Sequence, residues 1–136
     1  MITVNVDGLA EPNPGLGTYA FIVRDGGRRI KEGYGLAGKM VTNNFAEYEA
    51  IVQALSYLLP RAEEQIVVES DSRLLVKQMT GEYRAKKGAY LEKYLQAREL
   101  AGRFKQISFR WVPREENREA DLLTNVAYHR ERDREG

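Results

Sequence analysis

The spacing of hydrophobic and polar positions changes several times along the chain, and each change marks a new element. Residues 2–6 alternate apolar and polar as a strand does, and a Gly- and Pro-rich connection over 13–17 leads to a second strand over 19–24. A turn at Asp25, Gly26 and Gly27 leads into a third strand over 28–36. Three strands joined by short connections predict an antiparallel meander.

The middle of the chain alternates helical and strand patterns. From Asn44 the apolar residues recur at intervals of three and four, which predicts an amphipathic helix that ends at Pro60. A β-branched strand over 65–69 follows, and residues 70–72 can cap a helix that runs to about Met79.

The last part of the chain predicts a helix over about 89–102, a strand over 107–112 and a final helix over about 117–129. The tail 130–136 has no apolar residue, so we expect it to fray. This order of elements predicts an α/β fold with a mixed sheet whose faces are covered by helices.

Length and composition favour a single compact domain over 1–136, because 136 residues with 43% hydrophobic content suit one core. The chain has no cysteine, and its N-terminus lacks the basic start and apolar run of a signal peptide. Its apolar stretches are much shorter than the roughly 20 residues that cross a bilayer. These features predict a soluble cytoplasmic protein without a membrane partner.

The overall charge does not by itself indicate a nucleic-acid partner, because 21 Lys and Arg oppose 20 Asp and Glu, a formal net charge of +1. Basic residues gather only locally, at Arg84, Lys86 and Lys87, interleaved with Tyr83 and Tyr90. Such a run is typical of a solvated loop, and a polyanionic partner is the alternative.

Four acidic residues lie on four separate segments, at strand ends or in helices. Asp7 follows the first strand, Glu47 lies one turn into its helix, Asp71 follows the fourth strand, and Asp121 lies in the last helix. Each has a local structural alternative. Asp7 can form a turn, Glu47 can favour the helix dipole, Asp71 can cap a helix, and Asp121 can pair with Arg118.

Together, the acids favour a shared metal site. If strands one and four are adjacent and parallel, Asp7 and Asp71 lie at neighbouring carboxyl ends, where open α/β sheets bind ligands. Glu47 and Asp121 would then reach in from helices. Like charges crowded together repel unless cations neutralise them, and oxygen ligands without Cys or a suitable His favour Mg²⁺ or Mn²⁺ over Zn²⁺.

The segments that carry these acids resemble the type 1 ribonuclease H family, whose members cut the RNA strand of RNA/DNA hybrids. The matching segments are 6–8 with 13–15, 42–50, 69–72 and 112–121. Each is a weak signal alone, but their shared order and spacing are specific. The resemblance spans nearly the whole chain and implies a five-stranded mixed sheet of order 3-2-1-4-5 with helices on both faces.

The resemblance implies a role for each acid. Asp7 would bridge two Mg²⁺ ions, Asp121 would share the ion that activates water, and Glu47 and Asp71 would hold the ion on the leaving side. Mn²⁺ would also support activity. Hydrolysis would leave 5′-phosphate and 3′-hydroxyl ends.

The resemblance also implies contacts with the hybrid. Asn13, Asn43 and Asn44 match positions that read the minor groove together with Glu47, and Thr42 matches one that holds a DNA phosphate. Locally, 13–15 also suits a turn and 42–43 a helix cap, and capping is compatible with recognition.

The same comparison favours contacts with the phosphate backbone for Arg84, Lys86 and Lys87. Some family members carry a long basic protrusion with tryptophan at this place. This chain has only the short segment 81–88, and in this it resembles the members without the protrusion, which are found in archaea and some bacteria. Fewer phosphate contacts predict weaker and less salt-sensitive binding. The lone Trp111 lies in a strand and is predicted to be core.

One expected group is missing from the loop before Asp121. Many family members carry a histidine there, whereas this loop carries Arg114. Arg114 can replace it electrostatically but not as a neutral base near pH 7, because guanidinium stays protonated. The alternative is a surface arginine paired with Glu115 or Glu116.

The sequence therefore predicts a monomeric, metal-dependent endoribonuclease that acts on RNA/DNA hybrids and needs no organic cofactor. One alternative is another nuclease of this fold, such as a junction resolvase or the nuclease part of a polymerase chain. The residues Thr42, Asn43 and Asn44 disfavour it, because hybrid reading is their role in the resembling family. The other alternative is an inactive hybrid-binding module, which the intact acids disfavour because unneutralised charge would lower stability.

Overall fold

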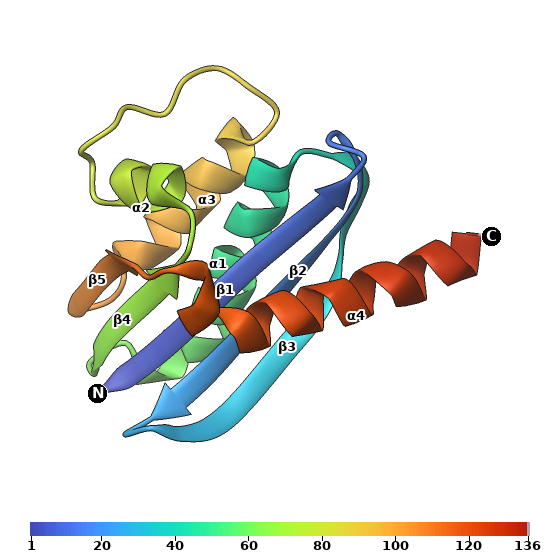
Figure 1. Cartoon of the computed structure of the whole chain (residues 1–136). Coiled ribbons are helices and arrows are strands. Elements are labelled where there is room, and N and C mark those ends of the chain that lie inside the picture. The colour runs from blue at the N-terminus through green and yellow to red at the C-terminus, as the bar shows by residue number, and fades with distance from the viewer. Residues whose placement is uncertain (136) are drawn as a thin grey trace.

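A computed structural model describes residues 1–135 and has a five-stranded sheet at its centre (Figure 1). The strands are β1 Ile2–Glu11, β2 Gly15–Asp25, β3 Arg28–Val41, β4 Gln65–Ser70 and β5 Gln106–Trp111. Their order is β3-β2-β1-β4-β5; β1, β2 and β3 pair antiparallel, and β4 and β5 run parallel to β1. The predicted mixed sheet and its strand order are confirmed.

Helices cover both faces of the sheet. The α-helices are α1 Asn43–Leu58, α2 Arg73–Met79, α3 Leu91–Ala101 and α4 Arg118–Glu135, and the 3₁₀ turns are η1 Leu59–Arg61 and η2 Arg114–Glu116. Helix α4 crosses the face of β1 to β3, while α1 packs on the opposite face with α3 behind it (Figure 1). Within residues 1–135, no helix is both long and apolar enough to cross a membrane.

The alternation of side chains along β1 separates an apolar face from a polar one. Ile2, Val4 and Val6 are buried against α1 in the main core. The intervening Asn5 and Asp7 are buried polar residues, and Asn5 bonds to side chains on the opposite side. Because side chains alternate between the faces of a strand, an apolar core and a polar site share one strand.

Strands β1, β2 and β3 are all longer than predicted, and the length of β1 changes the setting of Asp7. Strand β1 pairs with β2 as far as Glu11, so Asp7 lies inside the strand rather than at its end. The parallel pairing of β1 with β4, however, ends at Asn5 and Glu69. Asp7 therefore lies where β1 has a free edge, although the strand itself continues.

The final helix is also longer than predicted, and its predicted end near His129 is wrong. Helix α4 continues to Glu135, with a 3.2 Å ion pair between Arg134 and Glu131 one turn apart. Charged residues at this spacing support a helix without apolar residues. The predicted frayed tail included Gly136, which lies outside the described residues.

A close approach of β1 to α1 requires glycine at position 8. A Cβ there would lie 2.4 Å from the backbone carbonyl carbon of Ala46 and the backbone nitrogen of Glu47. We expect Gly8→Ala to lower the free energy of unfolding by roughly 1–3 kcal/mol or more, as overpacking does. Urea unfolding followed by circular dichroism measures the effect.

The matched control is Gly102→Ala at the end of α3. Its Cβ would lie 3.5 Å from the carbonyl oxygen of Arg98, and its φ of −65° suits any residue. Its stability should change by less than about 1 kcal/mol. Equal losses in the two variants would contradict the proposed packing constraint.

Candidate active site

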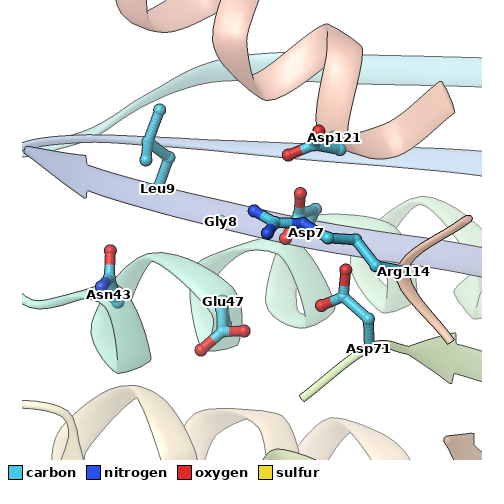
Figure 2. A pocket seen from close by; sticks show the side chains of 8 residues that line it. All are labelled: Asp7, Gly8, Leu9, Asn43, Glu47, Asp71, Arg114 and Asp121. Atoms are coloured by element: carbon cyan, nitrogen blue, oxygen red, sulfur yellow. The ribbon is translucent and has the colours of Figure 1, made fainter. Parts of the chain in front are cut away.

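Carboxylates from four parts of the chain line one cavity of about 330 Å³ (Figure 2). Asp7 comes from β1, Glu47 from α1, Asp71 from the residue after β4, and Asp121 from the first turns of α4. The remaining lining residues are Gly8, Leu9, Asn43 and Arg114. The structure thus brings together all four acids that the sequence singled out.

The end of β4 creates the opening in which these acids meet. Strand β4 stops at Ser70, so the edge of β1 beyond Asn5 has no parallel neighbour. Asp71 enters the space just beyond the strand end, and the absence of a Cβ at Gly8 lets α1 bring Glu47 close from the other face. The acids therefore converge from both faces of the sheet through a gap beside β1, beyond the end of β4.

The arrangement of oxygen atoms suits a hard divalent cation. Asp7, Glu47 and Asp71 each offer a carboxylate oxygen, and these atoms lie within 4.8 Å of one another. Asp121 faces Asp7 from the α4 side of the cavity (Figure 2). A set of carboxylate oxygens without sulfur or imidazole fits Mg²⁺ or Mn²⁺.

The crowding is visible in the proton affinities of the acids. Burial, followed by the charges of Asp71 and Glu47, raises the pKa of Asp7 to about 8. Burial and the charge of Asp71 raise the pKa of Glu47 to about 8. Burial also raises the pKa of Asp71, against the opposing effects of Asn117 and Arg114. The cluster without metal therefore retains protons near neutral pH, and a cation would displace them.

Comparison with known proteins shows the family of this chain. The family described as reverse transcriptase-like matches residues 5–127. A Synechocystis protein named ribonuclease HI is 32% identical over 146 aligned positions, which cover 93% of this chain and 87% of that protein. A Halobacterium salinarum protein of the same name is 35% identical over 122 residues, covering 89% of this chain.

Solved ribonuclease H structures are also similar to this chain. LC11-RNase H1, crystallised in complex with an RNA/DNA hybrid, has a TM-score of 0.88 at 32% identity, covering 96% of this chain and 98% of that one. The N-terminal RNase H domain of a Mycobacterium tuberculosis protein has a TM-score of 0.91 at 32% identity, covering 99% and 98%.

The chain belongs to the type 1 ribonuclease H family.

This chain is shorter than some of its ribonuclease H relatives. It spans 35% of the length of the bifunctional M. tuberculosis protein, to which it is 34% identical over 128 residues. It spans 61% of the length of the Halobacterium ribonuclease HI.

Two asparagines that the sequence did not single out hold the residues around the acidic cavity. Asn117 is 1% exposed; its Nδ2 donates to the Val6 carbonyl at 2.9 Å and its Oδ1 accepts from Asn5 at 3.1 Å. Its own carbonyl accepts from the backbone N–H of Asp121 at 3.1 Å. Asn125 donates to the Asp121 carbonyl at 2.8 Å and to its carboxylate at 3.3 Å. The Asn117 bonds fix the start of α4 against β1, and the Asn125 bonds hold Asp121 within the helix.

Sequence reasoning had only a weak signal for these two residues. Asn117 stands directly before a helix, where asparagine is ordinarily a cap, and Asn125 stands one turn after an acid. The hydrogen bond from Asn117 to Val6 spans 111 positions, which no local pattern encodes.

The Asp71 side chain can point into the acidic cavity because it is not needed to cap α2. Ser72 rather than Asp71 caps α2, accepting from the Leu75 N–H at 3.2 Å. The Asp71 carbonyl accepts from the indole N–H of Trp111 at 3.1 Å. The predicted core position of Trp111 is wrong: the ring is half-buried, with the Arg73 guanidinium 3.7 Å from its centroid. The Trp111 ring therefore holds the backbone at Asp71 in place.

The residues predicted to read the hybrid link the β1–β2 turn to the start of α1. Thr42 caps α1, accepting from the Phe45 N–H at 3.1 Å. The Asn43 carboxamide oxygen accepts from the Ala10 N–H at 2.7 Å, and its backbone N–H donates to Asn13 Oδ1 at 3.0 Å. Asn43 also lines the acidic cavity, and the half-buried Asn44 is next along the helix.

The three basic residues lie apart from the acids. Arg84, Lys86 and Lys87 are exposed on the segment between α2 and α3, and none lines the acidic cavity. Arg84 and Lys86 instead line a separate groove of about 540 Å³ together with Tyr83 and Tyr90. Any contact they make with a long ligand would therefore be at a distance from the acidic cavity.

The raised pKa values predict that the metal-free ribonuclease H chain loses stability as pH rises. The folded state holds protons that the unfolded chain releases above the ordinary carboxyl pKa of about 4. The free energy of unfolding should therefore fall between about pH 4 and about pH 8, and level off above the folded pKa values. Thermal unfolding in chelator measures this.

Asp7→Asn removes one of these acids, so its Tm should fall less over the same pH range. Mg²⁺ should raise the wild-type Tm more near the upper end of that range, because fewer protons then have to be displaced. Asp133→Asn, at an exposed position of α4, is the control. Parallel pH profiles for wild type and Asp7→Asn would contradict the coupling.

Proposed function

We propose that this chain is an endoribonuclease that hydrolyses the RNA strand of RNA/DNA hybrids with two divalent metal ions. The observation that carries the proposal is the acidic cavity, in which Asp7, Glu47 and Asp71 offer oxygens within 4.8 Å of one another and Asp121 faces them. Membership of the ribonuclease H family, and the hybrid bound to LC11-RNase H1, support this substrate.

Each acid has a proposed role that follows its position. Asp7 is central and would bind both ions. Asp121, on the α4 side, would bind the ion that activates the attacking water. Glu47 and Asp71 would bind the ion that faces the leaving group. When bound, Mg²⁺ or Mn²⁺ ions lower the pKa of a coordinated water and neutralise charge developing at phosphorus. Breaking the bond between phosphorus and the 3′ oxygen would give a 5′-phosphate and a 3′-hydroxyl.

The proposed specificity rests on groups at the mouth of the cavity. Recognition of RNA uses the 2′-hydroxyl, which distinguishes it from DNA at a given nucleotide. Asn13, Asn43 and Asn44 would read the minor groove beside Glu47, since Asn43 lines the same cavity. Thr42, at the N-terminus of α1, would hold a phosphate of the DNA strand.

The proposed enzyme needs one copy of the chain and no organic cofactor, because one chain supplies every acid of the site. Backbone contacts from Arg84, Lys86 and Lys87 would add affinity away from the cavity. With few such contacts, binding should depend only moderately on salt.

Purified protein incubated with end-labelled RNA/DNA hybrid should cut the RNA strand with Mg²⁺ or Mn²⁺ and not with chelator. Asp71→Asn should reduce cleavage by more than about 100-fold while the fold is retained, because it removes a charged metal ligand. Glu63→Gln, at an exposed position between η1 and β4, is the control and should cleave normally.

The same assay separates the alternatives. Binding of the hybrid without metal-dependent cleavage would identify an inactive binding module and overturn the proposal. Preferential cutting of a four-way DNA junction would identify a resolvase instead. Near-normal cleavage by Asp71→Asn would remove Asp71 from the site.

Arg114 is proposed to supply the positive charge of the missing loop histidine. Its side chain lines the acidic cavity, and its charge opposes the raised pKa of Asp71. In the described residues, no ion pair joins it to Glu115 or Glu116. Within residues 1–135 Arg114 forms no ion pair, and its charge lies beside the acids.

Arg114→Ala should lower kcat by about tenfold with less than about a twofold change in KM, because its charge acts at the reacting group. Arg114→Lys should recover part of the loss, since it keeps the charge without the guanidinium fork. Arg103→Ala, an exposed arginine paired with Glu99, is the control. Unchanged turnover in Arg114→Ala would leave Arg114 a surface residue.

A further inference from the structure

The basic segment between α2 and α3 is tied down at one point by the hydroxyl of Tyr90. This hydroxyl accepts a hydrogen bond from the backbone N–H of Lys86 at 3.0 Å and another from Gln78 Nε2 at 3.1 Å. Residues 84–88 have no regular secondary structure, and Gly81 at the start of the segment has a φ of +83°. These two bonds hold the backbone at Lys86, while nearer α2 the N–H of Tyr83 donates to the Lys77 carbonyl at 2.9 Å.

The same bonds continue inward to the helix that carries Glu47. Gln78 is 3% exposed, and its Oε1 accepts from the hydroxyl of Tyr48. The rings of Tyr48 and Tyr90 stack, with centroids 5.9 Å apart and planes 15° apart. Tyr48 follows Glu47 directly in α1. A continuous path of contacts thus joins an acid of the site to the backbone of Lys86.

This path sets where the basic residues stand relative to the acids. Lys86 and Arg84 line the groove of about 540 Å³ with Gln78 and Tyr90, and Lys87 is the next residue. A loop held in its binding conformation does not have to be ordered when a ligand binds, so less affinity is lost. The Tyr90 hydroxyl is the acceptor that keeps Lys86 in place.

We propose that Tyr90 is a positioning residue for hybrid binding, holding Lys86 and Lys87 at a fixed distance from Glu47. Phosphates on one part of the hybrid would then be bound while another part lies at the acids. The inference rests on the proposed function, and Tyr90 acts through the loop rather than on the substrate.

The test is Tyr90→Phe, which keeps the ring stacked on Tyr48 and removes only the acceptor. Affinity for a labelled RNA/DNA hybrid is measured by fluorescence anisotropy in chelator over a series of salt concentrations, and kcat and KM are measured with Mg²⁺. We expect Kd and KM to rise about fivefold and kcat to stay within about twofold. The slope of log Kd against log salt should become shallower by about one.

Two further variants sharpen the comparison. Tyr94→Phe removes a hydroxyl outside this segment, which accepts from Arg98 Nη1 at 2.9 Å within α3, and it should change none of these quantities. The double variant Lys86→Ala, Lys87→Ala should weaken binding at least as much as Tyr90→Phe. Adding Tyr90→Phe to it should cause no further loss, because the contacts that Tyr90 supports are already absent.

Wild-type affinity and salt slope in Tyr90→Phe would overturn the proposal, as would a lysine double variant that binds normally. A drop in Tm or kcat with unchanged KM would assign Tyr90 a purely structural role and would also overturn it. Failure of the proposed function looks different: the wild-type chain would not cut the hybrid with Mg²⁺ at all, whatever its affinity in chelator.

Discussion

Repulsion among partly buried carboxylates is the constraint on which the rest of this structure depends. Three oxygens within 4.8 Å of one another resist ionisation, so the protein must hold them together without help from the acids themselves. Rigid elements on three sides do so: β1 carries Asp7, α1 approaches it across Gly8, and Asn117 fixes α4. Stability is given up at this point of the fold, which is how sites prepared for cations are commonly built.

The two faces of the sheet hold the acids in place in different ways. The α1 side is an apolar core that sets how closely the helices approach. On the other side, β1, β2, β4 and β5 are joined by polar contacts, in which Asn5 bonds to Glu69 and Asn117 and accepts from Arg24, while Arg110 pairs with Glu69. Buried polar groups that are all satisfied are costly to rearrange, so this side resists displacement. The acids lie where the two sides meet.

Much of the architecture could be read from the chain because it depends on local pattern. Alternation in 2–6 and the change to helical spacing after Asn44 gave the element order, and the strand that ends before Asp71 gave the convergence of acids. The position of Trp111 and the end of α4 were missed, because a half-exposed stacked ring and a charged helix both lack an apolar signature. The roles of Asn117, Gln78 and Tyr90 could not be read from the chain for another reason: their partners are distant in sequence or lie across a loop, and such pairings exist only in three dimensions.

The bonds between the β1–β2 turn and α1 also give the cavity mouth a polarity. Asn13 and Asn43 have each committed the carboxamide oxygen to a backbone N–H of the protein. The group that remains for a ligand is mainly the NH₂ of each carboxamide, so this edge offers hydrogen-bond donors rather than acceptors. Every base pair displays acceptors in the minor groove, whichever bases it contains. In the proposed complex, such an edge would recognise the shape of the duplex and be nearly indifferent to its sequence.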